Sequence, residues 1–165
     1  MGATRATTRA RGKAALAADV WRIMAGFAFA RVQRGPHLAI LREMGLTPGH
    51  LRALSVLDPD EPRPMKAMAD SLLCDPSMAT WFVDRLEEKG LVERRSLPSD
   101  RRVKTVVLTP RGARARAIVW AALFEPPEEL LALDGERLEA LKAALAALPR
   151  TENPFLLSGP PGARP

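Results

Sequence analysis

The spacing of apolar residues between positions 75 and 109 changes once, at Gly90. Before Gly90 they recur every three or four positions, which is the period of an amphipathic helix with one buried face. These residues are Ala79, Phe82, Val83 and Leu86. After Gly90, apolar and polar residues alternate, and the closing letters RVKTVVL are rich in β-branched residues. The pattern predicts one helix followed by a two-stranded hairpin.

The ends of this helix carry their own signals. Asp75 can cap the first turn with its carboxylate, and Pro76 suits the first helical position because an amide hydrogen there would have no partner. Gly90 suits the left-handed residue that follows a helix. It places Leu86 and Leu91 at the two positions whose contact accompanies a Schellman motif. We therefore expect the helix to span residues 76–89.

A helix-turn-helix is predicted around this segment. A short helix is expected over residues 65–72, and only three residues separate it from the helix at 76–89. Two helices joined so closely, the second with a polar outer face, form a helix-turn-helix, and the following hairpin makes it a winged one. A helix is also expected over residues 48–57, whereas the Pro-rich connector at 58–64 is expected to have no regular structure.

Helical patterns flank this domain on both sides. The N-terminal pattern has a wide apolar face and is interrupted at Gly35 and Pro36, and the C-terminal one ends in leucines at coiled-coil-like spacing. Because each flank shows more apolar face than one small lobe can cover, we predict that they form a homodimer. The predicted fold is mainly α, with a small β-hairpin wing. The predicted divisions are a flexible basic tail at 1–13, an N-terminal dimerisation region at 14–44, the winged domain at 45–109, C-terminal dimerisation helices at 110–148 and a Pro/Gly-rich tail at 149–165.

Positive charge concentrates in and after the hairpin. Between positions 93 and 116, eight basic residues accompany two acidic ones, and this surplus of six equals the formal net charge of +6 of the 165-residue chain. Charge gathered in this way is typical of a surface that binds nucleic-acid phosphates. The basic residues are Arg94, Arg95, Arg101, Arg102, Lys104, Arg111, Arg114 and Arg116.

The remaining composition disfavours other classes of protein. No apolar run approaches the roughly 18 residues of a membrane span, so we expect a cytoplasmic protein without membrane contact. One cysteine and two histidines supply neither a disulfide framework nor a metal-ligand cluster, and phosphate-binding glycine loops and nucleophile elbows are absent. We expect no catalytic activity, no cofactor and no metal, and we expect His37 and His50 at the surface or at helix ends.

The letters GLTPGHLRAL, MKAMADSLLCDPSMATWFVDRLEEKGLVERR and SDRRVKTVVLTPRG, within residues 45–112, resemble the MarR (multiple antibiotic resistance regulator) family. The most specific part is the wing, with LVERR, SDRR and LTPRG. The resemblance implies a dimer joined through N- and C-terminal helices. It also implies binding to a palindromic double-stranded operator, with a small-molecule effector or an oxidant that releases the DNA.

Carried over by motif position, the resemblance places Ser77 and Thr80 where the recognition helix contacts DNA. It also places Arg102 in the minor groove, with Asp100 holding the wing. Trp81 departs from the family pattern, in which a small or basic residue is commoner. The DNA-binding candidates are Ser77, Met78, Thr80, Trp81 and Arg85 on the helix and Arg94, Arg95, Asp100, Arg101, Arg102 and Lys104 on the wing.

Three features keep alternatives open. Trp81 either contacts DNA, packs on the wing or lines an effector pocket. Cys74 is either an oxidation sensor or a buried structural residue, and we favour the second because it lies on the apolar side of a tight turn with no second cysteine. One N-terminal cluster either lines an effector pocket or belongs to core and dimer contacts. Its members are Trp21, Met24, Phe27 and Arg31.

The sequence therefore predicts a dimeric, ligand-responsive transcriptional regulator, and a repressor rather than an activator. Its recognition helix is expected in the major groove and its wing in the minor groove. The alternatives are a winged-helix protein–protein adaptor and a redox-sensing regulator acting through Cys74. A basic hairpin argues against the adaptor, since binding another protein does not require six surplus positive charges there.

Overall fold

The computed structural model describes residues 2–58, 61–96 and 103–149, with side chains described from residue 12 onward. The helices are α1 (Gly2–Arg34), α2 (His37–Glu43), α3 (Pro48–Ser55), α4 (Met65–Leu72), α5 (Pro76–Glu88), α6 (Pro110–Phe124), α7 (Glu128–Leu131) and α8 (Gly135–Ala146). The strands are β1 (Arg63–Pro64), β2 (Val92–Ser96) and β3 (Lys104–Leu108). They form an antiparallel sheet in the order β1-β3-β2.

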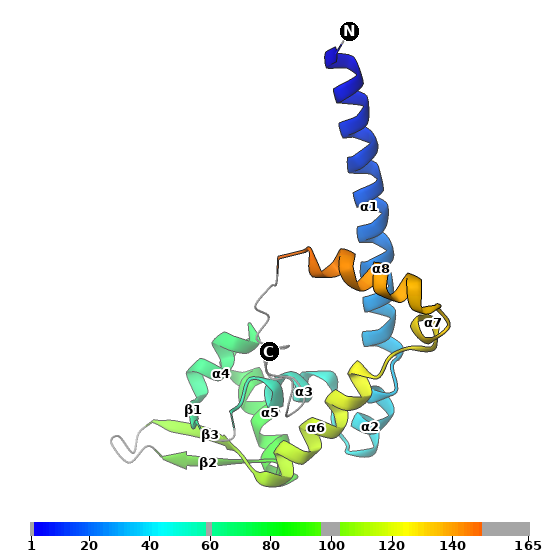
Figure 1. Ribbon diagram of the computed structural model, residues 1–165. Helices are drawn as coiled ribbons and strands as arrows, with labels where there is room; N and C mark the ends of the chain where they lie inside the picture. The colour runs from blue at the N-terminus through cyan, green and yellow to red at the C-terminus, as the bar shows by residue number, and fades with distance from the viewer. Residues whose placement is uncertain (1, 59–60, 97–102, 150–165) are drawn as a thin grey trace.

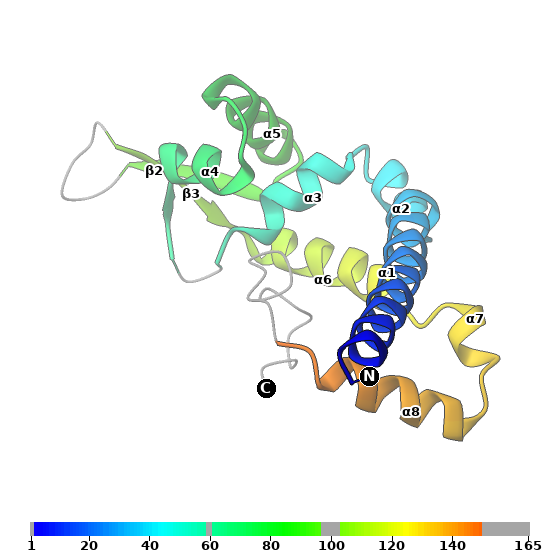
Figure 2. The same cartoon turned by 90° about the horizontal axis from the view of Figure 1, so that it is seen from above.

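The elements divide into a globular lobe and two projecting arms (Figure 1). Helices α2 to α6 and the sheet form the lobe, and β2 and β3 extend from it as the wing. Helix α1 projects away from the lobe, while α7 and α8 continue beyond the end of α6 (Figures 1 and 2). In the described part of the chain, no helix is long and apolar enough to cross a bilayer. The fold is a mainly helical winged helix-turn-helix, as predicted.

The lobe is held by one apolar core. Its least exposed members come from α2, α3, α4, α5, strands β2 and β3, and α6. They include Leu41, Leu54, Leu57, Met68, Val83, Leu86, Val106 and Val119. Burial of this kind is the main favourable contribution to folding. It fixes α5 and the strands relative to each other.

The end of α5 follows the predicted Schellman geometry. Gly90 has a φ of +65°, its amide donates to the Glu87 carbonyl at 2.8 Å, and the Leu91 amide donates to the Leu86 carbonyl at 2.9 Å. The last helical residue is Glu88 rather than Lys89, which is the C-cap. At the other end the prediction was wrong in one detail. The Asp75 side chain makes no capping hydrogen bond, and only its backbone carbonyl accepts, from the Ala79 amide.

The connector before α4 contains a strand that the prediction missed. Arg63 and Pro64 pair with Val106 and Thr105 of β3, although residues 58–64 were expected to be irregular. Proline has no amide hydrogen to donate, but an edge strand tolerates it because one side of the strand has no ladder partner. Arg63 adds a hydrogen bond from its guanidinium to the Val56 carbonyl.

Helix α1 begins at Gly2, whereas a tail was predicted up to residue 13. Residues 2–13 are mostly Ala, Arg and Thr, and they contain no proline, the strongest helix breaker. Alanine and arginine are among the strongest helix formers, so the helical pattern propagates backwards without a stop signal. The predicted break at Gly35 and Pro36 is present, since α1 ends at Arg34 and α2 starts at His37.

Candidate nucleic-acid interface

Helix α5 presents an outer face made of the predicted recognition residues. Ala79, Val83 and Leu86 are fully buried, at 0% exposure. At about 100° per residue, Trp81 lies roughly 200° from Ala79, on the side opposite the core. All five helix candidates have exposed side chains, namely Ser77, Met78, Thr80, Trp81 and Arg85.

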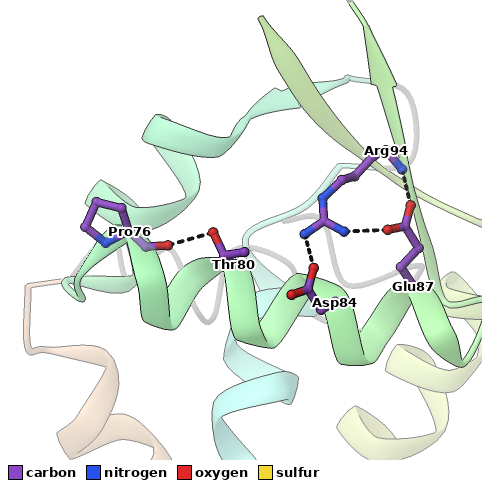
Figure 3. Close-up of polar contacts among 5 residues, drawn as sticks. All are labelled: Pro76, Thr80, Asp84, Glu87 and Arg94. Atoms are coloured by element: carbon purple, nitrogen blue, oxygen red, sulfur yellow. Dashed lines mark hydrogen bonds and ion pairs between the residues drawn. The ribbon is translucent and has the colours of Figure 1, made fainter.

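Two of these residues already have partners within the helix. The Thr80 hydroxyl donates to the Pro76 carbonyl at 2.8 Å, which leaves its oxygen lone pairs and its methyl group available to a ligand (Figure 3). Arg85 donates to Glu88 at 2.9 Å in an exposed pair. Exposed pairs of this kind contribute little to stability and exchange readily. Arg85 therefore remains able to turn towards a phosphate.

Trp81 packs on helix α3, an arrangement that the sequence did not indicate. The centroid of its ring lies 4.9 Å from that of the His50 ring and 5.3 Å from that of the Phe82 ring, and half of the residue stays exposed. His50 was expected at the surface or at a helix end. It lies in the first turn of α3, but it is 2% exposed, and its contact with Trp81 was not predicted. His37, expected in the same kind of place, is also buried.

His50 is held in place from within α3. Its Nδ1 accepts the Thr47 amide at 3.1 Å, so His50 takes the place that Glu or Gln occupies in a capping box. The ring proton then resides on Nε2, which has no hydrogen-bond partner among the described residues. Burial, with a smaller effect of the positive charge on Arg85, lowers the pKa of His50 and keeps it neutral. The sequence signal for this capping box was a threonine three residues before a histidine.

Arg94 joins the wing to the recognition helix. Its guanidinium forms ion pairs with Asp84 and Glu87 of α5, and its backbone amide donates to Glu87 at 2.9 Å (Figure 3). Burial acts to lower the pKa of Arg94, but the hydrogen bonds and the negative charges of Asp84 and Glu87 together outweigh it and raise that pKa. Arg94 was predicted to contact DNA. That contact stays a prediction; in the structure the charge of Arg94 is matched by two carboxylates of α5, which ties the wing to the recognition helix.

The rest of the described wing is more exposed. Arg95 pairs with Glu93 on the same strand, and Lys104 donates to Ser96 at 2.9 Å across the strand pair. The predicted tip residues lie outside the described residues, namely Asp100, Arg101 and Arg102.

The predicted charge surplus is spread more widely than the hairpin. Arg116 is directed into the lobe, where its guanidinium donates to the carbonyls of Leu54 and Leu57 at 3.3 and 2.6 Å. Burial lowers its pKa, while Asp58 acts in the opposite direction. Arg111 and Arg114 line a cavity of about 690 Å³ between the ends of α2 and α5 and helix α6. The basic surface of the described wing is therefore smaller than the residue count indicated.

Only two of the four predicted effector-pocket residues line a common cavity in the structure. Phe27 and Arg31 line a cavity of about 260 Å³ at the junction of α1 and α7, but Trp21 and Met24 do not, and Trp21 is 69% exposed. Arg31 also donates to the carbonyls of Ala122 and Glu125, at 3.0 and 2.7 Å, and so caps the end of α6.

Cys74 lies in the turn between α4 and α5, partly buried against the core. The preceding residue, Leu73, has a left-handed backbone, with φ at 52° and ψ at 47°. Within residues 2–58, 61–96 and 103–149, no group of three or more His, Cys, Asp or Glu side chains is arranged to hold a metal ion.

Known proteins with similar sequences and folds carry the same domain. Residues 46–104 match the family model described as MarR family. A putative transcriptional regulatory protein for the hcr operon of Thauera aromatica is 34% identical over 95 residues, covering 56% of this chain and 57% of that protein. The HTH-type transcriptional regulator MhqR of Bacillus subtilis (strain 168) is 32% identical over 72 residues, covering 44% of this chain and 50% of that protein. The chain thus spans about half the length of these curated relatives.

The fold agrees with this match. The crystal structure of YusO protein from Bacillus subtilis superposes with a TM-score of 0.60 at 26% identity, covering 81% of this chain and 96% of that one. The relatives from Thauera aromatica and Bacillus subtilis are both named as transcriptional regulators. A family model centred on the helix-turn-helix and wing, relatives above 30% identity and a shared fold all agree, and the winged helix-turn-helix domain of this chain belongs to the MarR family.

Proposed function

We propose that this protein is a dimeric transcriptional regulator, and a repressor, that acts on double-stranded DNA in the cytoplasm. In this proposal α5 enters the major groove and the β2–β3 wing follows the minor groove. One observation carries it: the exposed face of α5 and the wing are held together as a unit, through Arg94, within a MarR-family domain. The two relatives described above, named as transcriptional regulators, support the same class of activity.

A second copy of the chain is the proposed partner of the two arms. None of the residues of α7 or α8 is buried, although leucines recur along α8 every three or four positions. Large apolar side chains are also exposed along α1, and such surfaces on a soluble chain are typical of an interface. Two-fold symmetry would present two copies of α5, which suits a palindromic operator. The exposed residues are Leu16, Val20, Trp21, Ile23, Phe29 and Val32 on α1, Leu138, Leu141 and Leu145 on α8, and Leu148 just after α8.

A small-molecule effector belongs to the proposal at the cavity between α1 and α7. Arg31 and Phe27 provide a charged and an apolar group there, and Arg31 also contacts the end of α6. A ligand that engaged Arg31 would compete with its hydrogen bonds to α6, and that competition would alter how the arms hold the lobe.

The test is direct binding of DNA by the full-length chain. Light scattering should give the mass of a dimer, and the protein should select a palindromic duplex from a randomised pool. Affinity for that duplex should fall by roughly 10³ between 50 and 200 mM salt, because phosphate contacts release counterions. A monodisperse protein that retards neither the selected pool nor its own promoter region would overturn the proposal in favour of a protein–protein adaptor.

A further inference from the structure

The indole ring of Trp81 is a large, flat apolar group on the exposed face of α5. Half of it remains exposed although its ring has neighbours on two sides, and its immediate predecessor Thr80 keeps a methyl group on the same surface. An exposed indole costs free energy in water, since large apolar groups are stabilised by burial. When α5 lies against a bound ligand, the indole offers that ligand a large apolar surface in a fixed position.

Residues of α3 support the Trp81 ring from the side of the core. Gly49 has no side chain, and a Cβ there would lie 2.4 Å from the Phe82 ring, so the ring packs directly on the α3 backbone. His50 contacts Phe82 at 5.2 Å in an edge-on arrangement and Trp81 at 4.9 Å, and it is itself anchored to Thr47. Trp81 is therefore held by a buried ring that belongs to another helix.

We infer that Trp81, positioned by His50, is a specificity element that reads the C5-methyl groups of thymines in the major groove. This inference rests on the proposed DNA-binding function. In the major groove, the thymine methyl is the apolar feature that distinguishes an A·T pair, and apolar side chains recognise it by contact. A fixed indole suits this role because its position is set before binding, which lowers the entropy lost in the complex. The indole has no acceptor, and its single donor would find an acceptor on guanine, adenine and thymine alike, so hydrogen bonding by itself would not select thymine.

The experiment removes one methyl group at a time. The full-length protein selects its duplex from a randomised pool, and each thymine of that duplex is then replaced by deoxyuridine, which differs only by the C5-methyl. Wild-type protein should lose affinity about fourfold for each contacted methyl, the factor expected for burying one such group, at one or two positions in each half-site. Trp81→Ala should bind the thymine and uridine duplexes equally at those positions.

Met78→Ala is the matched control. Met78 is an exposed apolar residue of the same helix, almost one turn earlier and about 60° around the helix axis from Trp81. This variant should keep the loss at the positions read by Trp81. Selection of duplexes without thymine in the half-sites, or a uridine effect that persists unchanged in Trp81→Ala, would overturn the inference and leave the proposed function intact. Absence of selective binding by wild-type protein would remove both.

The role of His50 is tested by His50→Gln. Glutamine at this position can still accept the Thr47 amide, so the cap of α3 is retained while the ring beneath Trp81 is lost. Fluorine NMR of 5-fluorotryptophan protein, with the resonance assigned through Trp81→Phe, should show the Trp81 signal moving towards that of an exposed indole without DNA. The uridine effect should shrink in this variant, while losses from substitutions at other base pairs stay the same. An unmoved Trp81 signal and an unchanged uridine effect would show that His50 does not position the indole.

Discussion

Glu87 on α5 accepts two hydrogen bonds from Arg94 on β2, one from the backbone amide at 2.9 Å and one from the guanidinium (Figure 3). The second nitrogen of the same guanidinium reaches Asp84, one helical turn earlier. The first strand of the wing is thereby tied to the recognition helix at three points. The two elements that would contact DNA are expected to move as one body.

The contact between Arg94 and Glu87 predicts that Glu87→Gln weakens DNA binding, although the charge change alone would strengthen it. Glu87→Gln removes a negative charge from the proposed DNA-binding side, and charge alone would strengthen binding. If the contact with Arg94 matters more, the variant should bind DNA more weakly. It should also lower the free energy of unfolding by about 1–2 kcal/mol, the range for charged hydrogen bonds after allowance for partial exposure. Urea denaturation and fluorescence anisotropy measure the two effects.

Asp84→Asn and Arg95→Ala serve as the comparison for that result. Asp84 shares the Arg94 guanidinium, so its variant should change in the same direction as Glu87→Gln. Arg95 is an exposed neighbour that pairs only with Glu93 along its own strand, and its loss should leave stability nearly unchanged. Stronger DNA binding by Glu87→Gln would show that Arg94 contacts phosphate instead of bracing the wing.

Leu73→Gly should stabilise the protein. Leu73 has a positive φ, which costs a residue with a Cβ about 1–2 kcal/mol, and its side chain is 88% exposed, so little packing is lost. Part of the gain is offset by the greater freedom of glycine in the unfolded chain, which leaves a net gain of about 0.5–1 kcal/mol. The midpoint of thermal unfolding measures it. Asp70→Gly, an ordinary helical position of α4, should instead lower the midpoint.

Leu141→Glu combined with Leu145→Glu should convert the dimer into monomer. Both leucines lie on α8, where nothing in the described part of the chain buries them, and a charge placed in an apolar interface is costly. Light scattering over a dilution series measures the shift. Lys142→Glu, on the same helix, changes charge without changing the leucine stripe and should leave the mass of the dimer unaltered.

Stability should decline as the pH falls below about 6.5 because of the two histidines. Burial lowers the pKa of His50 and the pKa of His37. At His37 a hydrogen bond to the Val32 backbone acts in the opposite direction, but burial has the larger effect. Below the unfolded pKa of about 6.5 the unfolded chain binds protons that the folded chain does not, so unfolding becomes easier as pH falls. Each histidine contributes a slope of at most about 1.4 kcal/mol per pH unit within this window. Urea titrations of wild type and His50→Gln at several pH values should show a shallower decline in the variant.

Local signals were sufficient for most element boundaries. Pro76 and Gly90 delimit α5, and Thr109 caps α6 by accepting the Gly112 amide at 3.0 Å, as the Thr-Pro pattern predicts. Such signals act within one helical turn, so adjacent residues contain all the information they need. The change from helical spacing to alternation at Gly90 likewise places the helix and strand β2.

The partners of individual side chains were decided only by tertiary structure. The sequence did not show that Arg94 pairs with carboxylates of α5. Nor did it show that His50, expected at the surface or at a helix end, is buried against Phe82 and Trp81. Strand β1 exists because β3, about forty residues later, offers it an edge. In each case the sequence alone specifies the residue type and the local backbone, whereas burial and charge pairing depend on which distant residues the core brings into contact.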